Sequence, residues 1–228
     1  MAEGGIDGII VENASDLPFA RPEAIGPETV AALASACLRV RDAVGVPLGI
    51  TCVANGAVAG LAVAKAVGAA WVRVNQFVNA YVANEGLLSG AAGEALRYRS
   101  AIRAKDVRIF ADVHVKFGAH ALTADRTIPE QARDAEFFDA DVVIASGQRT
   151  GSPTPVGEIR AVQEGTVLPV LIGSGFSAET VDDLLTVADG AIIGSWLKQD
   201  GVWWKPVDPE RVAALMTRVR ALRQRVAP

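Results

Sequence analysis

Cysteine and histidine are both scarce in this sequence, with two of each among 228 residues. Cys37 and Cys52 show no metal-ligand spacing and are too few for a disulfide framework, which argues against a cysteine-held metal or a disulfide-stapled fold. We expect both to be small core residues of a protein in a reducing, cytoplasmic compartment.

Excess positive charge and long apolar runs are also absent. Lys and Arg number 22 against 26 Asp and Glu, and no basic stripe is present, so nucleic acid is not an expected partner. No apolar run reaches the roughly 18 residues of a membrane span, and no basic segment precedes an apolar one as in a secretory leader. Half of the residues are apolar, which is enough to bury the core of a single domain covering residues 1–228.

Short apolar segments with strand character alternate with helix signals at intervals of about 25 to 35 residues. Seven segments are predicted strands, at 6–11, 47–53, 70–75, 107–116, 141–146, 169–172 and 189–193. Helices are predicted at 27–45, 57–67, 93–104, 127–138, 155–164, 178–187 and from 208 onward, with Thr127, Ser177 and Asp208 as N-caps. Residues 76–90 form a long loop. The alternation predicts a parallel sheet with helices on both faces.

Polar residues near the end of almost every predicted strand favour a closed barrel over an open sheet, which would gather them at one switch point. We therefore predict an α/β fold, a (β/α)8 TIM barrel with seven βα units in this chain, lacking the first strand and helix. We expect either that the true start of the chain lies upstream of Met1, or that a gap between the strands at Ile6 and Ala191 is filled by a neighbour, by a lipid-like ligand or by collapse. Because exposed edges need cover, we expect a homo-oligomer.

The strand at 107–116, VRIFADVHVK, carries the strongest candidate for chemistry. Asp112, His114 and Lys116 occupy alternate positions, so a strand would project all three from one face, about 6–7 Å apart from one to the next. Ionisable groups on a buried strand are costly unless they pair or face a cavity. We predict that these three residues are catalytic; a buried Asp112–Lys116 ion pair with His114 in the core is the structural alternative.

Two mechanisms fit this row. Lys116 can be a nucleophilic amine or an acid–base group whose pKa a dry pocket lowers, as in a Schiff-base aldolase or lyase. Alternatively, Glu12, Asp112 and His114 bind a divalent metal that polarises a carbonyl of the substrate, as in an isomerase or lyase. Arg73 binds an anionic ligand or forms a structural ion pair with Glu12 or Asp112. Polar residues at strand ends are the predicted substrate-binding set: Glu12, Asn13, Asn55, Arg73, Asn75 and Thr150.

Two glycine turns follow the last two predicted strands and suggest a phosphate site. Gly173-Ser174-Gly175 ends one strand and Gly194-Ser195 ends the next, with Lys198 close behind. Barrels bind phosphate at this place through backbone N–H groups, and glycine allows the anion to approach the backbone closely. Two ordinary tight turns are the alternative. The expected partner is a phosphorylated small molecule.

The sequence resembles the BtpA/SgcQ family along nearly its whole length. The matching segments are GGIDGIIVEN (4–13), GPETVAAL (26–33), PLGITCVAN (47–55), WVRVN (71–75), ADVHVK (111–116), SGQRTG (146–151), PVLIGSG (169–175) and DGAIIGSWLKQDG (189–201). The resemblance implies a TIM barrel of the ribulose-phosphate-binding type. It implies no particular reaction. The family takes its name from photosystem I accumulation, which cannot be the role of every member.

Three features depart from the family pattern. An extra strand and helix usually precede GGIDGIIVEN, the pair Asn55-Gly56 replaces Asn-Asp, and Phe117-Gly118 replaces His-Ala. The last two departures favour a non-catalytic binding or assembly factor for a larger complex. From the candidate catalytic row and the glycine turns we nevertheless expect an enzyme that acts on a phosphorylated sugar or nucleotide-like molecule, with that factor and a metal-dependent isomerase or lyase as the alternatives. The sequence names no cofactor beyond that divalent metal.

Overall fold

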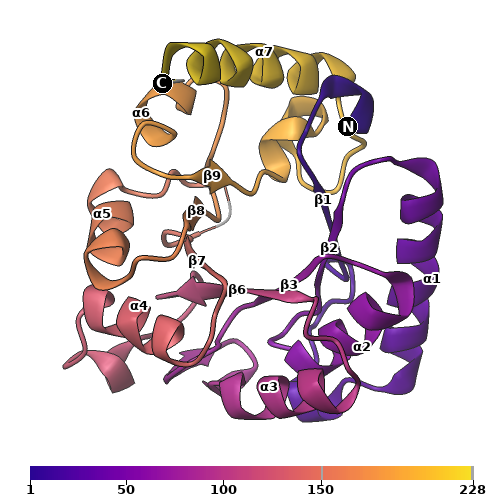
Figure 1. The fold of residues 1–228 in the computed structure, drawn as a ribbon, viewed down its shortest axis with the longest axis vertical. Helices are drawn as coiled ribbons and strands as arrows, with labels where there is room; N and C mark the ends of the chain where they lie inside the picture. The colour runs from indigo at the N-terminus through magenta and orange to yellow at the C-terminus, as the bar shows by residue number, and fades with distance from the viewer. Residues whose placement is uncertain (150, 227–228) are drawn as a thin grey trace.

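Seven parallel strands curl into a barrel-like sheet, as the alternation of segments predicts (Figure 1). The computed structural model describes residues 1–149 and 151–226. The strands run in the order β1-β2-β3-β6-β7-β8-β9, each parallel to its neighbour. Their bounds are β1 Ile9–Glu12, β2 Leu48–Thr51, β3 Trp71–Val74, β6 Arg108–Val113, β7 Val142–Ala145, β8 Val170–Ile172 and β9 Gly190–Ala191.

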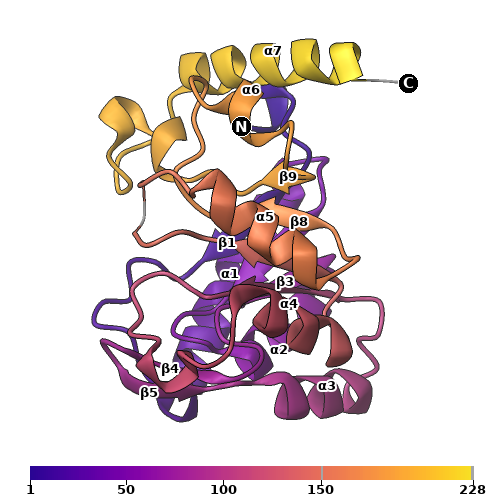
Figure 2. The same ribbon diagram turned by 90° about the vertical axis from the view of Figure 1, so that its left-hand side faces the viewer.

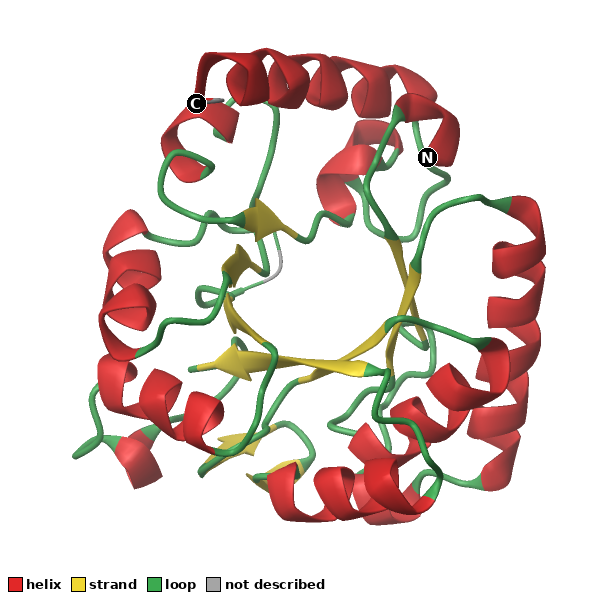
Figure 3. Ribbon diagram, in the orientation of Figure 1, coloured by secondary structure: helices red, strands yellow, loops and turns green. Residues whose placement is uncertain are grey.

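Helices form the outer wall of this sheet (Figure 3). They are α1 Pro27–Ala43, α2 Ala57–Val67, α3 Ala92–Ala101, α4 Ile128–Phe137, α5 Val156–Gly165, α6 Val181–Leu184 and α7 Pro209–Val226, with short 3-10 turns η1 Ala2–Gly4, η2 Pro22–Ala24, η3 Ala121–Thr123, η4 Ser195–Leu197 and η5 Gln199–Gly201. None of the described helices combines the length and the apolar composition needed to cross a bilayer.

The predicted helix caps are confirmed at two positions and wrong at a third. The Thr127 hydroxyl accepts from Glu130 N at 3.4 Å, and the Asp208 carboxylate accepts from Glu210 N at 2.9 Å. Ser177 does not cap α6, because the chain turns once more before the helix begins and Thr180 occupies the N-cap position. The Thr180 hydroxyl instead accepts from Ser177 N at 3.0 Å.

The long loop expected between the third strand and the next helix contains a β-hairpin. Strands β4 (Ala80–Ala83) and β5 (Gly86–Ser89) pair antiparallel as a separate two-stranded sheet. Figure 2 shows this hairpin at one end of the molecule, outside the ring of parallel strands. A second ladder contact, Val82 with Ala119, fastens the hairpin to the loop after β6.

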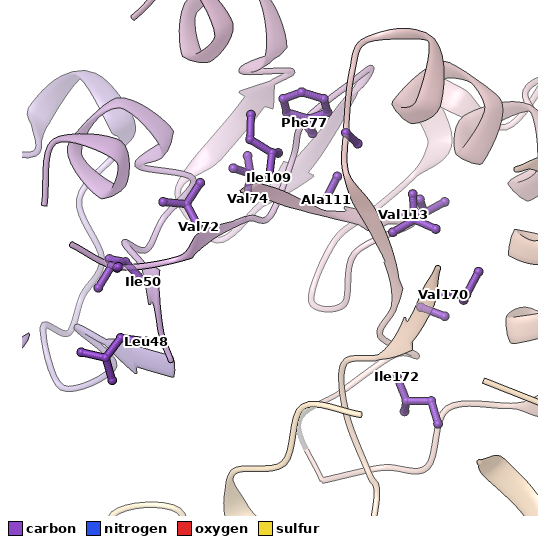
Figure 4. Packing of buried hydrophobic residues seen from close by; sticks show 14 of the residues in the cluster. Leu48, Ile50, Val72, Val74, Phe77, Ile109, Ala111, Val113, Val170 and Ile172 are labelled. Atoms are coloured by element: carbon purple, nitrogen blue, oxygen red, sulfur yellow. The ribbon is translucent and has the colours of Figure 1, made fainter. Parts of the chain in front are cut away.

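The main hydrophobic core lies between the outer face of the sheet and the helices. Strand residues alternate between the two faces, so every second side chain joins this core. Figure 4 shows part of this core and labels Phe77, from the loop after β3, together with nine strand residues, Leu48, Ile50, Val72, Val74, Ile109, Ala111, Val113, Val170 and Ile172. All ten are buried, which leaves the intervening residues to face the interior of the barrel.

The floor of that interior is aromatic. Trp71 of β3 and Phe110 of β6 stack with ring centroids 5.4 Å apart. Gly49 on the neighbouring strand makes room for the indole, because a Cβ there would collide with the Trp71 ring. Above this layer the inward positions carry polar groups, and Glu12, Thr51 and Arg73 share one register row across β1, β2 and β3.

The sheet ends on both sides of one gap, as the strand count predicts. Strands β1 and β9 each have one neighbour, and Figure 3 shows them facing each other across the ring. No ladder joins β1 to β9 in the part of the chain that the structure describes, so these two strands do not close the sheet by pairing with each other.

Candidate functional site

A cavity of about 1380 Å³ occupies the interior of the barrel, and its lining includes residues at both ends of the strands, such as Gly8 before β1 and Lys116 after β6. Ten of the predicted site residues line it: Glu12, Arg73, Asn75, Lys116, Gly173, Ser174, Gly175, Gly194, Ser195 and Lys198. Asn13, Asn55, Asp112 and His114 are not lining residues, and Thr150 lies outside the described residues.

Arg73 and Asp112 form a buried, two-pronged ion pair at the base of the cavity. Arg73 Nε and Nη2 donate to the two carboxylate oxygens of Asp112, each at 2.9 Å. Asn75 Nδ2 donates to the same carboxylate at 3.2 Å. The Asp112 side chain has no exposed surface, and its proximity raises the pKa of Arg73 against the opposing effect of burial. Asp112 thus neutralises and orients Arg73 instead of facing a ligand.

Lys116 presents its amine to the same cavity. Burial and the positive charge of Arg73 lower the pKa of Lys116 to about 8, against the opposing pull of Asp112 and Glu12. Its Nζ donates to the carbonyl of Gly173 at 3.4 Å, at the first of the two predicted phosphate turns. A substantial fraction of this amine is neutral near physiological pH, which suits a base or a nucleophile.

The expected single row of Asp112, His114 and Lys116 is wrong at its middle member. Strand β6 ends at Val113, and His114 adopts a left-handed φ of 54°, which breaks the alternation. The imidazole stacks on His120 at 4.0 Å between centroids, and His120 stacks in turn on Tyr81 at 5.5 Å. Burial, with a smaller effect of His120, lowers the pKa of His114. His114 therefore packs on His120 and does not line the cavity.

The loop that carries Lys116 is bound firmly to its neighbours. Lys116 N donates to Ser146 Oγ at 3.2 Å, and Phe117 N donates to the carbonyl of Gln148, also at 3.2 Å. Phe117 itself has a left-handed φ of 63° and is half exposed at the mouth of the cavity. Two non-glycine residues in this conformation within four positions cost free energy, and such strain concentrates at functional sites.

The two glycine turns lie side by side at the cavity wall, after the paired strands β8 and β9. The Ser174 hydroxyl accepts from Gly151 N and donates to the carbonyl of Arg149, both at 3.1 Å, so it ties down the loop after β7. Gly175 has a φ of 68°, and a Cβ there would collide with Ser152. At Gly194 a Cβ would meet nothing within 4 Å, which leaves that turn open to a ligand.

Asn13 and Asn55 serve the framework. Asn13 exchanges two hydrogen bonds with the backbone of Val53, at 2.8 and 3.0 Å. Asn55 is buried; its amide donates to the carbonyls of Gln76 and Ser89 and accepts from Gln76 N. Both side chains are fully engaged in holding loops together, which explains their place at strand ends.

The geometry does not support the alternative of a divalent-metal site. Glu12, Asp112 and His114 do not come together, and no group of three or more His, Cys, Asp or Glu residues able to hold a metal occurs among residues 1–149 and 151–226. Asp112 is already occupied by Arg73 and Asn75.

Two residues near the site were missed from the sequence. Tyr81 of the hairpin lines the cavity, and burial, Glu85 and Asp112 together raise its pKa. Thr51 is buried in the row between Glu12 and Arg73, with its hydroxyl lacking any partner among the described residues. A polar residue alternating with apolar ones in PLGITCV was the available signal for Thr51; no local signal marks Tyr81.

Comparison with known proteins identifies related sequences over nearly the whole chain. The model of the BtpA family matches residues 1–221. An Archaeoglobus fulgidus protein is 39% identical over 94% of this chain and 82% of its own length, and a mitochondrial protein of Caenorhabditis elegans is 38% identical over 97% and 81%. The photosystem I biogenesis protein BtpA of Synechocystis is 37% identical over 95% of this chain and 75% of its own.

Solved structures with the same fold are much more distant in sequence. Thiamine phosphate pyrophosphorylase from Pyrococcus furiosus superposes with a TM-score of 0.61 at 16% identity, covering 97% of this chain and 86% of that one. Phosphoribosyl anthranilate isomerase from Thermus thermophilus gives 0.60 at 16% identity, covering 97% and 91%. These likenesses show the TIM-barrel-like fold.

Proposed function

Since the chain belongs to the BtpA family, we propose that its barrel is an enzyme active site of the ribulose-phosphate-binding type, acting on a phosphorylated sugar or nucleotide-like small molecule. The observation that carries this proposal is Lys116, whose pKa falls to about 8 and whose amine reaches the wall of the cavity at Gly173. A lysine tuned in this way beside a glycine turn is a catalytic arrangement more readily than a structural one.

The chemistry follows from what this amine can do. As a base, neutral Lys116 removes a proton from the carbon next to a substrate carbonyl, and the resulting ammonium returns it elsewhere on the same substrate, which is an isomerisation. As a nucleophile, its nitrogen adds to the carbonyl carbon; loss of water then gives a Schiff base that draws electrons from an adjacent C–C bond. Arg73, fixed by Asp112, supplies a positive charge near the oxygen that becomes negative.

The phosphate end of the substrate would lie at the turns Gly173–Gly175 and Gly194–Ser195, with Lys198 nearby. Gly194 supports this assignment, because nothing fills the space beside it. Two proteins that share the fold, thiamine phosphate pyrophosphorylase and phosphoribosyl anthranilate isomerase, carry phosphate in their names. Ser174 contributes indirectly, by holding the neighbouring loop in place.

The test separates the two roles of Lys116. The protein is incubated with a panel of aldose and ketose phosphates, once with borohydride to trap a Schiff base and once in deuterated water to detect proton exchange. We expect a mass increase at Lys116, or deuterium in the substrate, and loss of both in Lys116→Met. The matched control is Lys105→Met, which replaces an exposed lysine. Reactivity that survives Lys116→Met, or that is absent with every compound, rules the proposal out.

A non-catalytic role in the assembly of a larger complex is the second candidate, and one relative favours it. The Synechocystis protein with 37% identity is named for photosystem I biogenesis. On this reading the chain forms a stable complex with a protein partner and shows no rise in melting temperature with any phosphorylated sugar. Lys116→Met would then leave the complex unchanged.

A further inference from the structure

Tyr81 is a buried tyrosine at the cavity that the chemistry of Lys116 leaves without a role. It lies on strand β4 of the hairpin, where Val82 points outward and is 43% exposed, whereas Tyr81 is 5% exposed and lines the cavity. Its hydroxyl finds no hydrogen-bond partner among residues 1–149 and 151–226, yet it is not fully enclosed and opens on the cavity. A tyrosine hydroxyl this deep in a protein normally has a partner, so the partner of Tyr81 is to be sought in a ligand.

The ring of Tyr81 is held in one position by the segment that follows Lys116. It stacks on the imidazole of His120, with ring centroids 5.5 Å apart and an interplanar angle of 12°. It also packs against the backbone of Gly118, where a Cβ would collide with the ring. Packing of this kind fixes the direction of the hydroxyl without using it.

The hairpin and the loop that carries Lys116 are bound to each other. Val82 and Ala119 exchange two backbone hydrogen bonds, at 3.1 and 2.8 Å. His120 Nε2 forms a hydrogen bond with the carbonyl of Val115 at 2.8 Å, directly before Lys116. The tyrosine hydroxyl and the lysine amine are therefore held by one connected unit, which fixes their relative position as a catalytic pair requires.

The surroundings of the two groups push them toward opposite protonation states. Burial, with smaller effects of Glu85 and Asp112, raises the pKa of Tyr81, whereas the pKa of Lys116 falls to about 8. The charge of Asp112 acts on both groups, so both lie near the same carboxylate. Tyr81 consequently keeps its proton and acts as a hydrogen-bond donor at pH values where part of Lys116 is neutral and acts as a base or nucleophile.

We propose that Tyr81 is a second catalytic residue, whose hydroxyl donates a hydrogen bond to the substrate oxygen that becomes negative during the reaction at Lys116. The inference rests on the proposed function. That oxygen belongs to an enolate when Lys116 removes a proton from the neighbouring carbon, and to an alkoxide when the lysine nitrogen adds to the carbonyl carbon. The proton of Tyr81 stays on the hydroxyl in both cases. The substrate is then a sugar phosphate in its open-chain form, which has the free carbonyl group that the ring form lacks.

The experiment uses stable compounds that carry a charged oxygen at a distance from a phosphate. Phosphoglycolate and phosphoerythronate have a carboxylate in that place, on a shorter and a longer chain, and inorganic phosphate has none. Each is titrated by calorimetry into the whole 228-residue chain and its variants. Tyr81→Phe removes only the hydroxyl and keeps the ring that stacks on His120. Tyr98→Phe, at the chain's other tyrosine on α3, is the matched control.

We expect Tyr81→Phe to weaken the binding of at least one carboxylate compound by about tenfold or more, because a hydrogen bond to a charged group is lost. Binding of inorganic phosphate should not change, and Tyr98→Phe should bind all three compounds as wild type does. With any sugar phosphate that exchanges deuterium at Lys116, Tyr81→Phe should lower kcat by about 100-fold and change KM little. Circular dichroism verifies that both variants fold.

Nuclear magnetic resonance gives a readout on the unaltered protein. Tyrosine labelled at the ring carbon that bears the hydroxyl yields two signals, one for each tyrosine of the chain. The signal that Tyr81→Phe removes should shift when the carboxylate compound binds, whereas inorganic phosphate should shift neither signal. A tyrosine with a purely structural role would not respond in this way.

Three results would overturn the inference while leaving borohydride trapping at Lys116 unaffected. These are carboxylate compounds that Tyr81→Phe binds as wild type does, a Tyr81 signal that does not respond to them, and binding of phosphate when neither carboxylate compound binds. If none of the three compounds binds and no sugar phosphate reacts, the proposed function fails, and the inference that rests on it fails too. The two failures are therefore distinguishable.

Discussion

At the scale of single residues, the charged groups in the cavity are the most informative, and Lys116 gives a prediction that needs no substrate. Its pKa is about 8 in the folded protein and 10.5 ordinarily. Between these pH values the unfolded chain binds one more proton than the folded one, so folding stability rises with pH across this window. Below pH 8 both states hold the proton, and the contribution is constant.

Urea denaturation of wild type and Lys116→Met at pH 7.5 and 9.5 isolates this contribution. The wild-type free energy of unfolding, relative to Lys116→Met, should increase by about 1–2 kcal/mol at the higher pH. Lys105→Met should show no such pH dependence relative to wild type. A flat difference for Lys116→Met would mean that the amine keeps its ordinary pKa, and the proposed role as a base would lose its basis.

Arg73 and Asp112 are predicted to depend on each other, so that removing one charge costs more stability than removing both. Asp112→Asn leaves a buried guanidinium without its counter-charge and should cost about 3–5 kcal/mol in denaturant unfolding. Replacing both residues with apolar ones, Arg73→Met and Asp112→Leu, should recover most of that loss. The exposed pair Arg223–Asp7 is the control, since Asp7→Asn should cost less than about 1 kcal/mol. Equal costs at the two sites would contradict a buried, mutually dependent pair.

The backbone conformation of Phe117 is predicted to lower the free energy of unfolding. Its left-handed φ of 63° is unfavourable for any residue with a Cβ, and its ring is half exposed. Phe117→Gly should therefore stabilise the protein by about 1 kcal/mol, whereas Phe117→Ala, which keeps the Cβ, should not. Thermal unfolding of the two variants gives the comparison. A destabilised Phe117→Gly would show that the ring packs more than its exposure indicates.

At the scale of elements, the sequence predicts most helices and strands but not those that tertiary contacts determine. Helix α2 begins and ends as predicted, because small apolar residues run into Gly68, which has a left-handed φ of 68°. The hairpin β4–β5 was missed, since each of its strands has only four residues and its position relies on contacts from elsewhere, such as Val82 with Ala119. The changed orientation of the His114 side chain was also missed, because the expected alternation assumes that strand β6 continues beyond Val113.

Asn55 is the main anchor of that hairpin, which gives a prediction at this scale. Its side chain makes three hydrogen bonds to the backbone at the two ends of the hairpin segment, at Gln76 and Ser89. Asn55→Ala should lower the free energy of unfolding by about 2–3 kcal/mol, because buried backbone groups lose their partners. Amide exchange in β4 and β5 should accelerate more than exchange in β7. Uniform acceleration would mean that Asn55 supports the whole fold and not this element.

At the scale of the whole molecule, the cavity of the barrel and the open sheet follow from one pattern. This is the repeat of strand and helix, with seven units instead of the eight of a closed barrel. The parallel barrel and its gap were predictable because they depend on periodicity and on counting. The polar residues of the candidate site were predictable only as a set. Which of them face the cavity depends on partners that the sequence does not reveal, such as the use of Asp112 by Arg73. The homo-oligomeric state and the cytoplasmic location stay predictions.

An open sheet should also be least stable at its edges. Strand β9 has only two residues and one neighbouring strand, and the helix before it in the chain, α6, has only four residues. Strands β3 and β6, by contrast, are each paired with a strand on both sides. In native-state hydrogen exchange, the amides of β9 should open at a lower free energy than those of β3 and β6, which should exchange only through global unfolding. Strand β1, with four residues, should lie between them. Equal protection across all seven strands would mean that the sheet behaves as a closed ring, with no weaker edge at β1 or β9.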